Sequence, residues 1–163
     1  MVKLLFRIAR LKIMGTFIGL VFAYCPFLVP VKKIRQNRKA VSFRHPAASY
    51  PNHVLIIPRK VARTVFQLAE DDFDAVIEMA AKIRHGDSRD FALVINGGKR
   101  QDVMQAHFHL FTGNLTGSLL NVGATAPGRP DLRRLLTQHN IPEDSFSLVF
   151  QFENDAEPVM YLM

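Results

Sequence analysis

The chain has 163 residues, of which 48% are apolar and 21% charged, so it can form one ordinary domain with a buried core and is not a disordered tail. Its single cysteine, Cys25, excludes an intramolecular disulfide and a multi-cysteine zinc site. The net charge of +7 arises near the N-terminus: residues 1–40 hold nine lysines and arginines and no acid, whereas residues 41–163 hold 12 against 14 acids. We therefore expect no nucleic-acid partner.

Residues 1–31 form a hydrophobic N-terminal segment flanked by cations. Residues 13–31 carry no charge, four cations precede them and five follow closely. The run just reaches the length of a membrane-spanning helix, although Pro26 and Pro30 lie inside it and leave residues 13–25 as its proline-free part. We predict a hydrophobic N-terminal helix that makes the protein membrane-associated, on a side that the balanced flanking charges do not determine.

Two other interpretations of this segment remain open. It can be a cleaved export signal, although Ala23-Tyr24-Cys25 is a poor small-x-small cleavage site. It can also be a hydrophobic helix that packs on the body of the protein or on a dimer partner.

The body alternates short apolar runs with two helical patterns. Acids at residues 70–72 open a helix with apolar residues at helical spacing, which ends at His85-Gly86, and a second helix follows Pro130 over residues 131–139. We predict about five strands, at residues 41–43, 54–57, 91–95, 106–111 and 145–152, with another one over 159–162. Residues 114–128 are rich in glycine, threonine, asparagine and alanine and are expected to be a loop. Consecutive strands with separate helices predict an α+β fold with an antiparallel sheet.

The most informative stretch is residues 96–113. His107 and His109 are two residues apart on a predicted strand, so both imidazoles and Gln105 share one face, opposite apolar side chains. A strand with one apolar and one Gln-His-His face can present polar groups to a site. It can also be a histidine pair on a solvated face, or part of a zinc site that takes a third ligand from His45 or His53.

This stretch resembles the motif of the histidine triad (HIT) family. The pattern Gln101-x-Val103-x-Gln105-x-His107-Phe108-His109 is similar to the family's Q-x-V-x-H-φ-H-φ-H, where φ is apolar. The resemblance covers roughly residues 25–113. It includes Phe43, Pro51 and residues 53–60, which resemble the F…P-x-H-x-L-V-I-P-K strand, and residues 93–96, which resemble the strand entering the phosphate loop.

The resemblance implies an enzyme that acts on nucleotides. His107 matches the histidine that attacks the α-phosphate and forms a nucleotidyl-histidine, which water then hydrolyses. His109 matches the last histidine, which stabilises phosphate oxygens. The resemblance also implies nucleotide-binding roles for residues that hydrogen-bond phosphate or orient the site: His53, Asn96, Gln101, Asp102 and Val103.

Three positions depart from the family pattern. Gln105 replaces the first triad histidine and can still orient the nucleophile through a hydrogen bond, but it supplies no charge. Asp102 stands where a serine is typical, and its carboxylate repels phosphate unless it is protonated or paired. His45 replaces the acid that holds ribose hydroxyls in many members.

We therefore predict a HIT-like fold with residues 1–31 as a hydrophobic segment, 32–113 as the HIT-like domain and 114–163 as a C-terminal extension. The expected function is nucleotide hydrolysis or transfer, with His107, His109 and Gln105 as the catalytic set and without a metal or cofactor. One alternative is a catalytically weakened HIT fold that binds nucleotides or regulates, and another is a membrane-tethered CDP-diacylglycerol-type pyrophosphatase. The resemblance also implies a homodimer.

Overall fold

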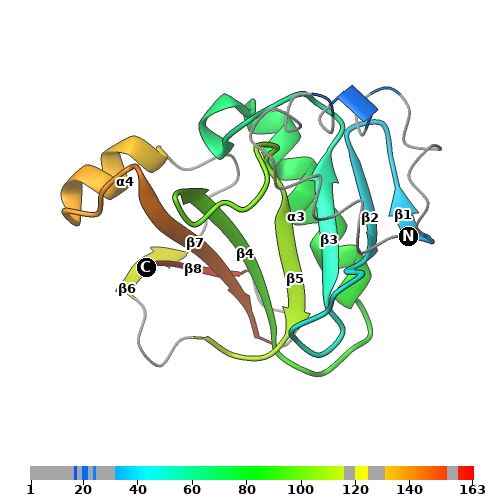
Figure 1. Ribbon diagram of the computed structural model, residues 1–163. Helices are drawn as coiled ribbons and strands as arrows, with labels where there is room; N and C mark the ends of the chain where they lie inside the picture. The colour runs from blue at the N-terminus through cyan, green and yellow to red at the C-terminus, as the bar shows by residue number, and fades with distance from the viewer. Residues whose placement is uncertain are drawn as a thin grey trace.

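The computed structural model describes residues 32–115, 120–124, 131–153 and 158–163, together with Phe17, Leu20, Val21 and Tyr24. The described chain forms one twisted antiparallel sheet with helices packed against it (Figure 1). Its strands are β1 (Lys33–Gln36), β2 (Ala40–Arg44), β3 (Val54–Pro58), β4 (Phe91–Gly98), β5 (Phe108–Thr112), β6 (Leu120–Ala124), β7 (Ser145–Phe152) and β8 (Val159–Leu162). The helices are the short 3-10 helix η3 (Val65–Gln67), α3 (Glu70–Arg84) and α4 (Leu132–Gln138).

The order of the strands in the sheet is β1-β2-β3-β5-β4-β7-β8-β6. The central strand β4 pairs with β5 on one side and with β7 on the other, and the pairing with β7 extends over all eight residues of both strands. Residues 145–152 of the C-terminal part therefore belong to the same sheet as residues 32–113. The division of the chain at residue 113 stays a prediction, and so does the homodimer.

One face of the sheet is covered by both helices and forms the main core. Alternate side chains of β3, β4, β5 and β7 point to this face, because successive residues of a strand point to opposite sides. They pack against Phe73, Val76 and Met79 of α3 and against Leu132 and Leu136 of α4. The four apolar side chains of this face of β7 are fully buried: Phe146, Leu148, Phe150 and Phe152. The side chain of His109, in β5, points to the opposite face.

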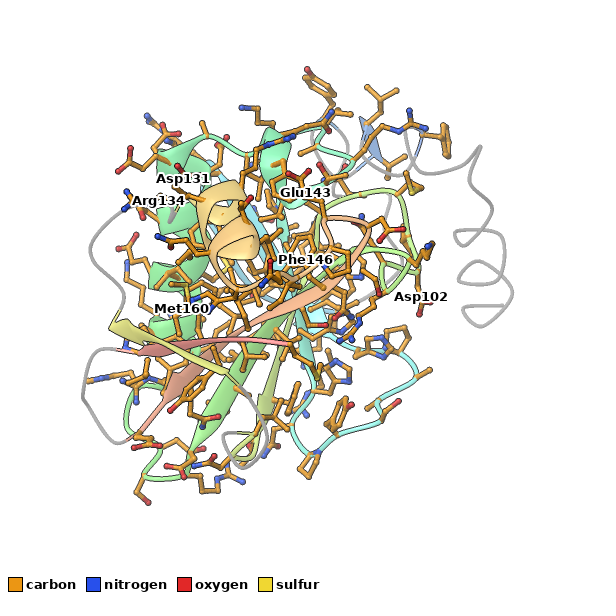
Figure 2. All side chains as sticks on the ribbon, turned by 90° about the vertical axis from the view of Figure 1, so that its left-hand side faces the viewer. Asp102, Asp131, Arg134, Glu143, Phe146 and Met160 are labelled. Atoms are coloured by element: carbon orange, nitrogen blue, oxygen red, sulfur yellow. The ribbon has the colours of Figure 1, made fainter. Side chains whose placement is uncertain are left out.

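Helix α4 is positioned by a side-chain cap and by the start of β7. Asp131 precedes the helix, and its side chain accepts a hydrogen bond from the backbone N–H of Arg134 at 3.1 Å. Figure 2 shows both residues at one end of this helix, with Phe146 beneath it and Met160 of β8 close by. Helix α3 begins with Glu70, Asp71 and Asp72, as predicted from its acidic first turn.

The structure confirms the α+β class, the antiparallel sheet and both predicted helices. It corrects the number of strands, since the described sheet has eight rather than about five. Strand β1 was not predicted because its sequence, KIRQ, has only one apolar residue, and the side chains of Ile34, Arg35 and Gln36 are all exposed. Strand β6 falls within the range predicted to be a loop.

Nearly all of residues 1–31, including the predicted N-terminal helix, lies outside the described residues. The prediction of a membrane-associated protein is wrong: within the part of the chain that the structure describes, no helix has the length and apolar character to cross a bilayer. The sequence contains a physical reason, because Pro26 and Pro30 interrupt the uncharged run.

Candidate functional site

The candidate site lies where β5 begins, on the face of the sheet opposite α3. His109 is in β5, between Leu55 of β3 and Val94 of β4. His107 precedes the strand, which begins at Phe108 rather than at residue 106 as predicted. Their imidazole rings meet edge to face, with centroids 4.9 Å apart, so the structure brings together the two histidines that the alternating pattern placed on one face.

The ring of His107 is held in one tautomer by the backbone. Its Nδ1 atom lies 2.7 Å from the carbonyl oxygen of Gln105, and because a carbonyl only accepts, Nδ1 carries the proton and donates. Desolvation lowers the pKa of His107, while the hydrogen bond to Gln105 and the charge of Asp102 raise it. The neutral ring then has an unprotonated Nε2 atom, which is the form that can act as a nucleophile.

The side chain of Gln105 has a different place from the one predicted. It is 1% exposed, and instead of lying beside the histidines it is bonded to the segment that follows β3. Its Oε1 accepts from the N–H of Ala62 at 3.3 Å, and its Nε2 donates to the carbonyl of Lys60 at 2.9 Å. Gln105 therefore orients His107 through its backbone carbonyl, while its side chain anchors that backbone.

His109 is paired with His53 rather than standing alone. His53 Nε2 lies 2.9 Å from His109 Nδ1, and the Nδ1 atom of His53 is buried without a hydrogen-bond partner. An orphaned buried N–H is rarer than an orphaned acceptor, so we assign the shared proton to His53 Nε2, which donates to His109. This tautomer leaves His109 with a proton on Nε2, which can donate to an anion.

Both of these histidines are neutral at physiological pH. Desolvation, followed by the charge of His45, lowers the pKa of His53 to about 4. Desolvation, followed by the neighbouring imidazoles, lowers the pKa of His109 to about 2. His109 therefore acts as a neutral hydrogen-bond donor and not as a cation.

His45, His53 and His109 are close enough to be considered as a metal site. Their potential ligand atoms lie within 4.8 Å of one another. The rings of His45 and His53 are stacked, however, with centroids 4.2 Å apart and an interplanar angle of 6°. Their in-plane lone pairs therefore lie in two separate, nearly parallel planes and do not converge on one ion. In addition, Nδ1 of His45 accepts the N–H of Ala47 at 3.1 Å. The cluster as it stands fits stacked and hydrogen-bonded imidazoles better than a tetrahedral ion.

Gln101 and Val103 shape the loop that precedes His107. Nε2 of Gln101 donates both of its hydrogens, to the carbonyl of Arg63 at 2.6 Å and to that of Val103 at 2.7 Å. The same Val103 carbonyl accepts the N–H of Gln105 at 2.8 Å. The predicted nucleotide contact of Gln101 is thereby restricted to its Oε1 atom. Asp102 is exposed, and Figure 2 shows it at the periphery of the molecule.

A serine that the sequence analysis did not select completes the site. Ser147 of β7 is paired with Asn96 of β4, and its hydroxyl donates to Asn96 Oδ1 at 2.7 Å. The amide hydrogens of Asn96 then remain free for other acceptors. The signal that could have found Ser147 is the alternation in SFSLVFQF, which places Ser145, Ser147 and Gln151 opposite the phenylalanines.

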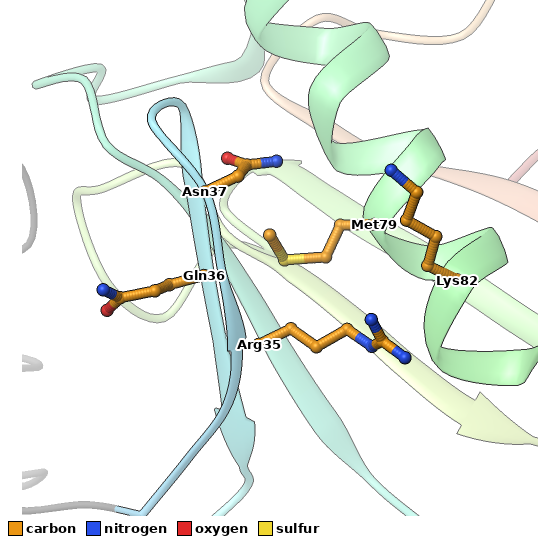
Figure 3. Close-up of a pocket in the computed structure, with 5 residues that line it drawn as sticks. All are labelled: Arg35, Gln36, Asn37, Met79 and Lys82. Atoms are coloured by element: carbon orange, nitrogen blue, oxygen red, sulfur yellow. The ribbon is translucent and has the colours of Figure 1, made fainter.

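A separate pocket lies between β1 and α3 and contains none of these residues. It is lined by Arg35, Gln36, Asn37, Met79 and Lys82, and Figure 3 shows Met79 and Lys82 coming from the helix. Lys82 is paired with Glu78 at 2.5 Å one helical turn away. This pocket has cations but no nucleophile, so it does not replace the histidine cluster as the candidate site.

Comparison with known proteins gives three consistent matches. Residues 28–115 match the HIT domain family. An uncharacterised HIT-like protein of Chlamydia muridarum (strain MoPn / Nigg) is 32% identical over 99 residues, which are 56% of this chain and 78% of that protein. The fold is similar to that of a HIT family hydrolase from Legionella pneumophila Philadelphia 1, with a TM-score of 0.50 and 24% identity over 61% of this chain and 96% of the other.

A second similar structure has a name that refers to what it binds. It is a histidine triad nucleotide-binding protein from Candida albicans, with a TM-score of 0.50 and 20% identity, and the match covers 77% of this chain and 92% of that one. At this level of identity the likeness concerns the fold. Ser147 lies outside the segment that matches the HIT domain.

Proposed function

Because the chain belongs to the HIT domain family, we propose that it is a nucleotide-binding hydrolase or transferase in which His107 attacks the α-phosphate of a nucleotide. The observation that carries this proposal is the 2.7 Å hydrogen bond from His107 Nδ1 to the Gln105 carbonyl. It leaves Nε2 as the free nitrogen of a neutral ring, and a neutral imidazole is an effective nucleophile near pH 7.

The reaction then has two steps. The lone pair of His107 Nε2 forms a bond to phosphorus while the bond from phosphorus to the leaving group breaks, and the leaving group departs with that electron pair. Water then forms a bond to phosphorus while the bond from phosphorus to Nε2 breaks, which releases the nucleoside monophosphate and returns the lone pair to Nε2. The proton that the water loses passes to the solvent. A different acceptor in place of water makes the same enzyme a transferase.

His109 and Asn96 bind the phosphate in this proposal. His109 donates to the phosphate through its Nε2–H group. Its neutral state and its contact with His53 support this role. Asn96 donates through its amide hydrogens, since Ser147 occupies its oxygen. Donors fixed before the substrate arrives stabilise the charge of the transition state more than donors that must reorient.

The proposal is tested with the full-length chain and its His107→Ala variant. The substrates are a nucleoside phosphoramidate, a dinucleoside polyphosphate and CDP-diacylglycerol, and the products are separated chromatographically. We expect turnover of at least one substrate, its loss in His107→Ala and a trapped nucleotidyl-protein that only the unmodified chain forms. His139→Ala is the matched control, because His139 is exposed in the turn after α4. Turnover that survives in His107→Ala contradicts the proposal.

The second candidate is a nucleotide-binding module without turnover. The observation that favours it is the carboxylate of Asp102, which acts on His107 electrostatically and would repel an incoming phosphate. The two candidates differ in one result. Binding of a nucleoside monophosphate without hydrolysis of any of the three substrates supports the binding module.

A further inference from the structure

Strand β7 contributes to the candidate site although it lies outside the segment that matches the HIT domain. Ser147 is 1% exposed, and its hydroxyl donates to Asn96 Oδ1 at 2.7 Å across the β4–β7 pair. The backbone of Ser147 is itself held on the other side by two hydrogen bonds with Met163, at 2.7 and 3.0 Å. The backbone of Ser147 is thus held by Met163, and its hydroxyl is held by Asn96 of β4.

The same hydroxyl also contacts a cation of the β4–β5 loop. Nη1 of Arg100 donates to Ser147 Oγ at 3.4 Å, so a chain of hydrogen bonds leads from the guanidinium through the hydroxyl to the amide oxygen of Asn96. Ser147 is neutral, so this contact directs the guanidinium without cancelling its charge. The remaining N–H groups of Arg100 and Asn96 are all hydrogen-bond donors. They can therefore bind an anionic ligand but not a cation.

The beginning of β7 also determines the course of this loop. The backbone N–H of Lys99 donates to the carbonyl of Asp144 at 2.6 Å, and the two side chains form an ion pair. Gly98 has a φ of +60° and lies so close to the Asp144 backbone that a Cβ atom would collide with it. The charge of Lys99 is therefore engaged, and Arg100 is the loop cation that Ser147 directs.

We propose that Ser147 is a positioning residue that holds the Asn96 amide and the Arg100 guanidinium together as an anion-binding subsite beside His107. The ligand class is an anionic leaving group, such as the phosphate chain of a nucleoside polyphosphate. This assignment of the leaving group rests on the proposed function. A guanidinium stabilises an anionic leaving group, whereas an amine leaving group gains nothing from it. The subsite itself requires only that the chain binds polyphosphate.

The first experiment measures binding without catalysis. Inorganic pyrophosphate is titrated into the full-length chain and followed by calorimetry and by the side-chain amide signal of Asn96 in NMR spectra. We expect Ser147→Ala and Arg100→Ala each to weaken binding about tenfold, and the double variant to be little worse than either, since both act on one subsite. Ser145→Ala, on the same face of β7, serves as the control and should bind as the unmodified chain does.

The second experiment separates positioning from a merely structural effect. In Ser147→Ala, kcat/KM for a dinucleoside polyphosphate should fall about tenfold, because its contacts with both Asn96 and Arg100 are weakened. The value for a phosphoramidate should fall by less than about threefold, because only the contact of its phosphate with Asn96 is weakened. Ser147→Thr keeps the hydroxyl and should restore both the Asn96 signal and the rate. The proposal is overturned if the chain does not bind pyrophosphate, or if neither Ser147→Ala nor Arg100→Ala weakens that binding. It is also overturned if Ser145→Ala weakens the binding as much as Ser147→Ala does. If pyrophosphate binds as described but nothing is turned over, the proposed function fails and the subsite stands.

Discussion

The Nε2 atom of His53 lies 2.9 Å from the Nδ1 atom of His109, and this contact joins the residue just before β3 to β5 at the candidate site. Removing the side chain of His53 leaves His109 Nδ1 without its donor, so His109 can carry its proton on either nitrogen. The donor that faces the substrate is then present only part of the time. His53 acts in this arrangement by fixing a neighbour, not by touching the substrate.

We predict that His53→Phe, which keeps an aromatic ring, lowers kcat/KM about tenfold, corresponding to about 1.4 kcal/mol. The measurement is steady-state kinetics on the best substrate of the panel. His139→Phe is the matched control, because it makes the same change at an exposed histidine. An unchanged kcat/KM in His53→Phe would show that His109 does not need this donor.

The neutral histidines also predict how stability depends on pH. The pKa of His53 is lowered to about 4 and that of His109 to about 2 in the folded chain, whereas both return to the ordinary value near 6.5 on unfolding. Between these values the unfolded state binds more protons, so stability rises with pH up to about 6.5 and is lost as the pH falls.

Urea unfolding at pH 7 and pH 5 measures this effect. We expect a lower free energy of unfolding at pH 5, and a smaller loss in His53→Phe because one buried histidine no longer titrates. The titration of His53 and His109 by NMR provides the direct control. Equal unfolding free energies at the two pH values would contradict the assignment of neutral, buried rings.

Asp102 is predicted to set the acid limit of activity. Its charge stabilises protonated His107 and raises the pKa of that ring against desolvation. In Asp102→Asn this contribution is absent, so the acid limb of the kcat/KM profile should move to lower pH. KM should fall as well, because a carboxylate no longer repels the phosphate. Asp74→Asn, at an exposed position of α3, is the control and should change neither quantity. An acid limb that moves upward would contradict this account.

Regular periodicity explains which parts of the fold could be predicted from the sequence. Helix α3 and strand β7 have long apolar patterns with periods of 3.6 and 2, and both occur close to their predicted bounds. Strand β1 could not be predicted because its stability comes from pairing with β2 rather than from burial of its own side chains. Long uncharged runs are a weaker guide, as the incorrect membrane prediction shows.

Only those features of the candidate site that depend on residues close together in the sequence could be predicted. The alternation of His107 and His109 correctly predicted that their rings lie together. The side chain of Gln105 lies elsewhere, because the chain before β5 is not extended. Ser147 could not be found from its neighbours, because its partner Asn96 is 51 positions away and meets it only through the pairing of β4 with β7. Tertiary pairing of this kind has no signature in a single sequence.

Gln105 is predicted to matter for stability more than for chemistry. In Gln105→Ala the N–H of Ala62 and the carbonyl of Lys60 lose their buried partners, which should cost about 1–3 kcal/mol for each group left unsatisfied. The carbonyl of Gln105 is retained, so the folded fraction should keep the same acid limb in its pH–rate profile. Urea unfolding and the pH dependence of kcat/KM are measured on the same preparation. A shifted acid limb with unchanged stability would assign a direct catalytic role to the side chain.

Strand β7 links the core to the candidate site, since its phenylalanines pack in the core and Ser147 contacts Asn96. Phe150 is fully buried, and its ring meets that of Phe73 of α3 edge to face with centroids 5.6 Å apart. Phe150→Ala should lower the free energy of unfolding by about 3–5 kcal/mol, a large part of the roughly 5–15 kcal/mol available to a small domain.

Ile34→Ala is the matched control, since this residue is 40% exposed in β1 and should cost little. Both are measured by urea unfolding, together with the Asn96 amide signal under conditions where the variants are folded. Phe150 points away from the site, so that signal should be unchanged while stability falls. A small loss of stability in Phe150→Ala would mean that residues 145–152 are not integral to the core, and the positioning role of Ser147 would lose its structural basis.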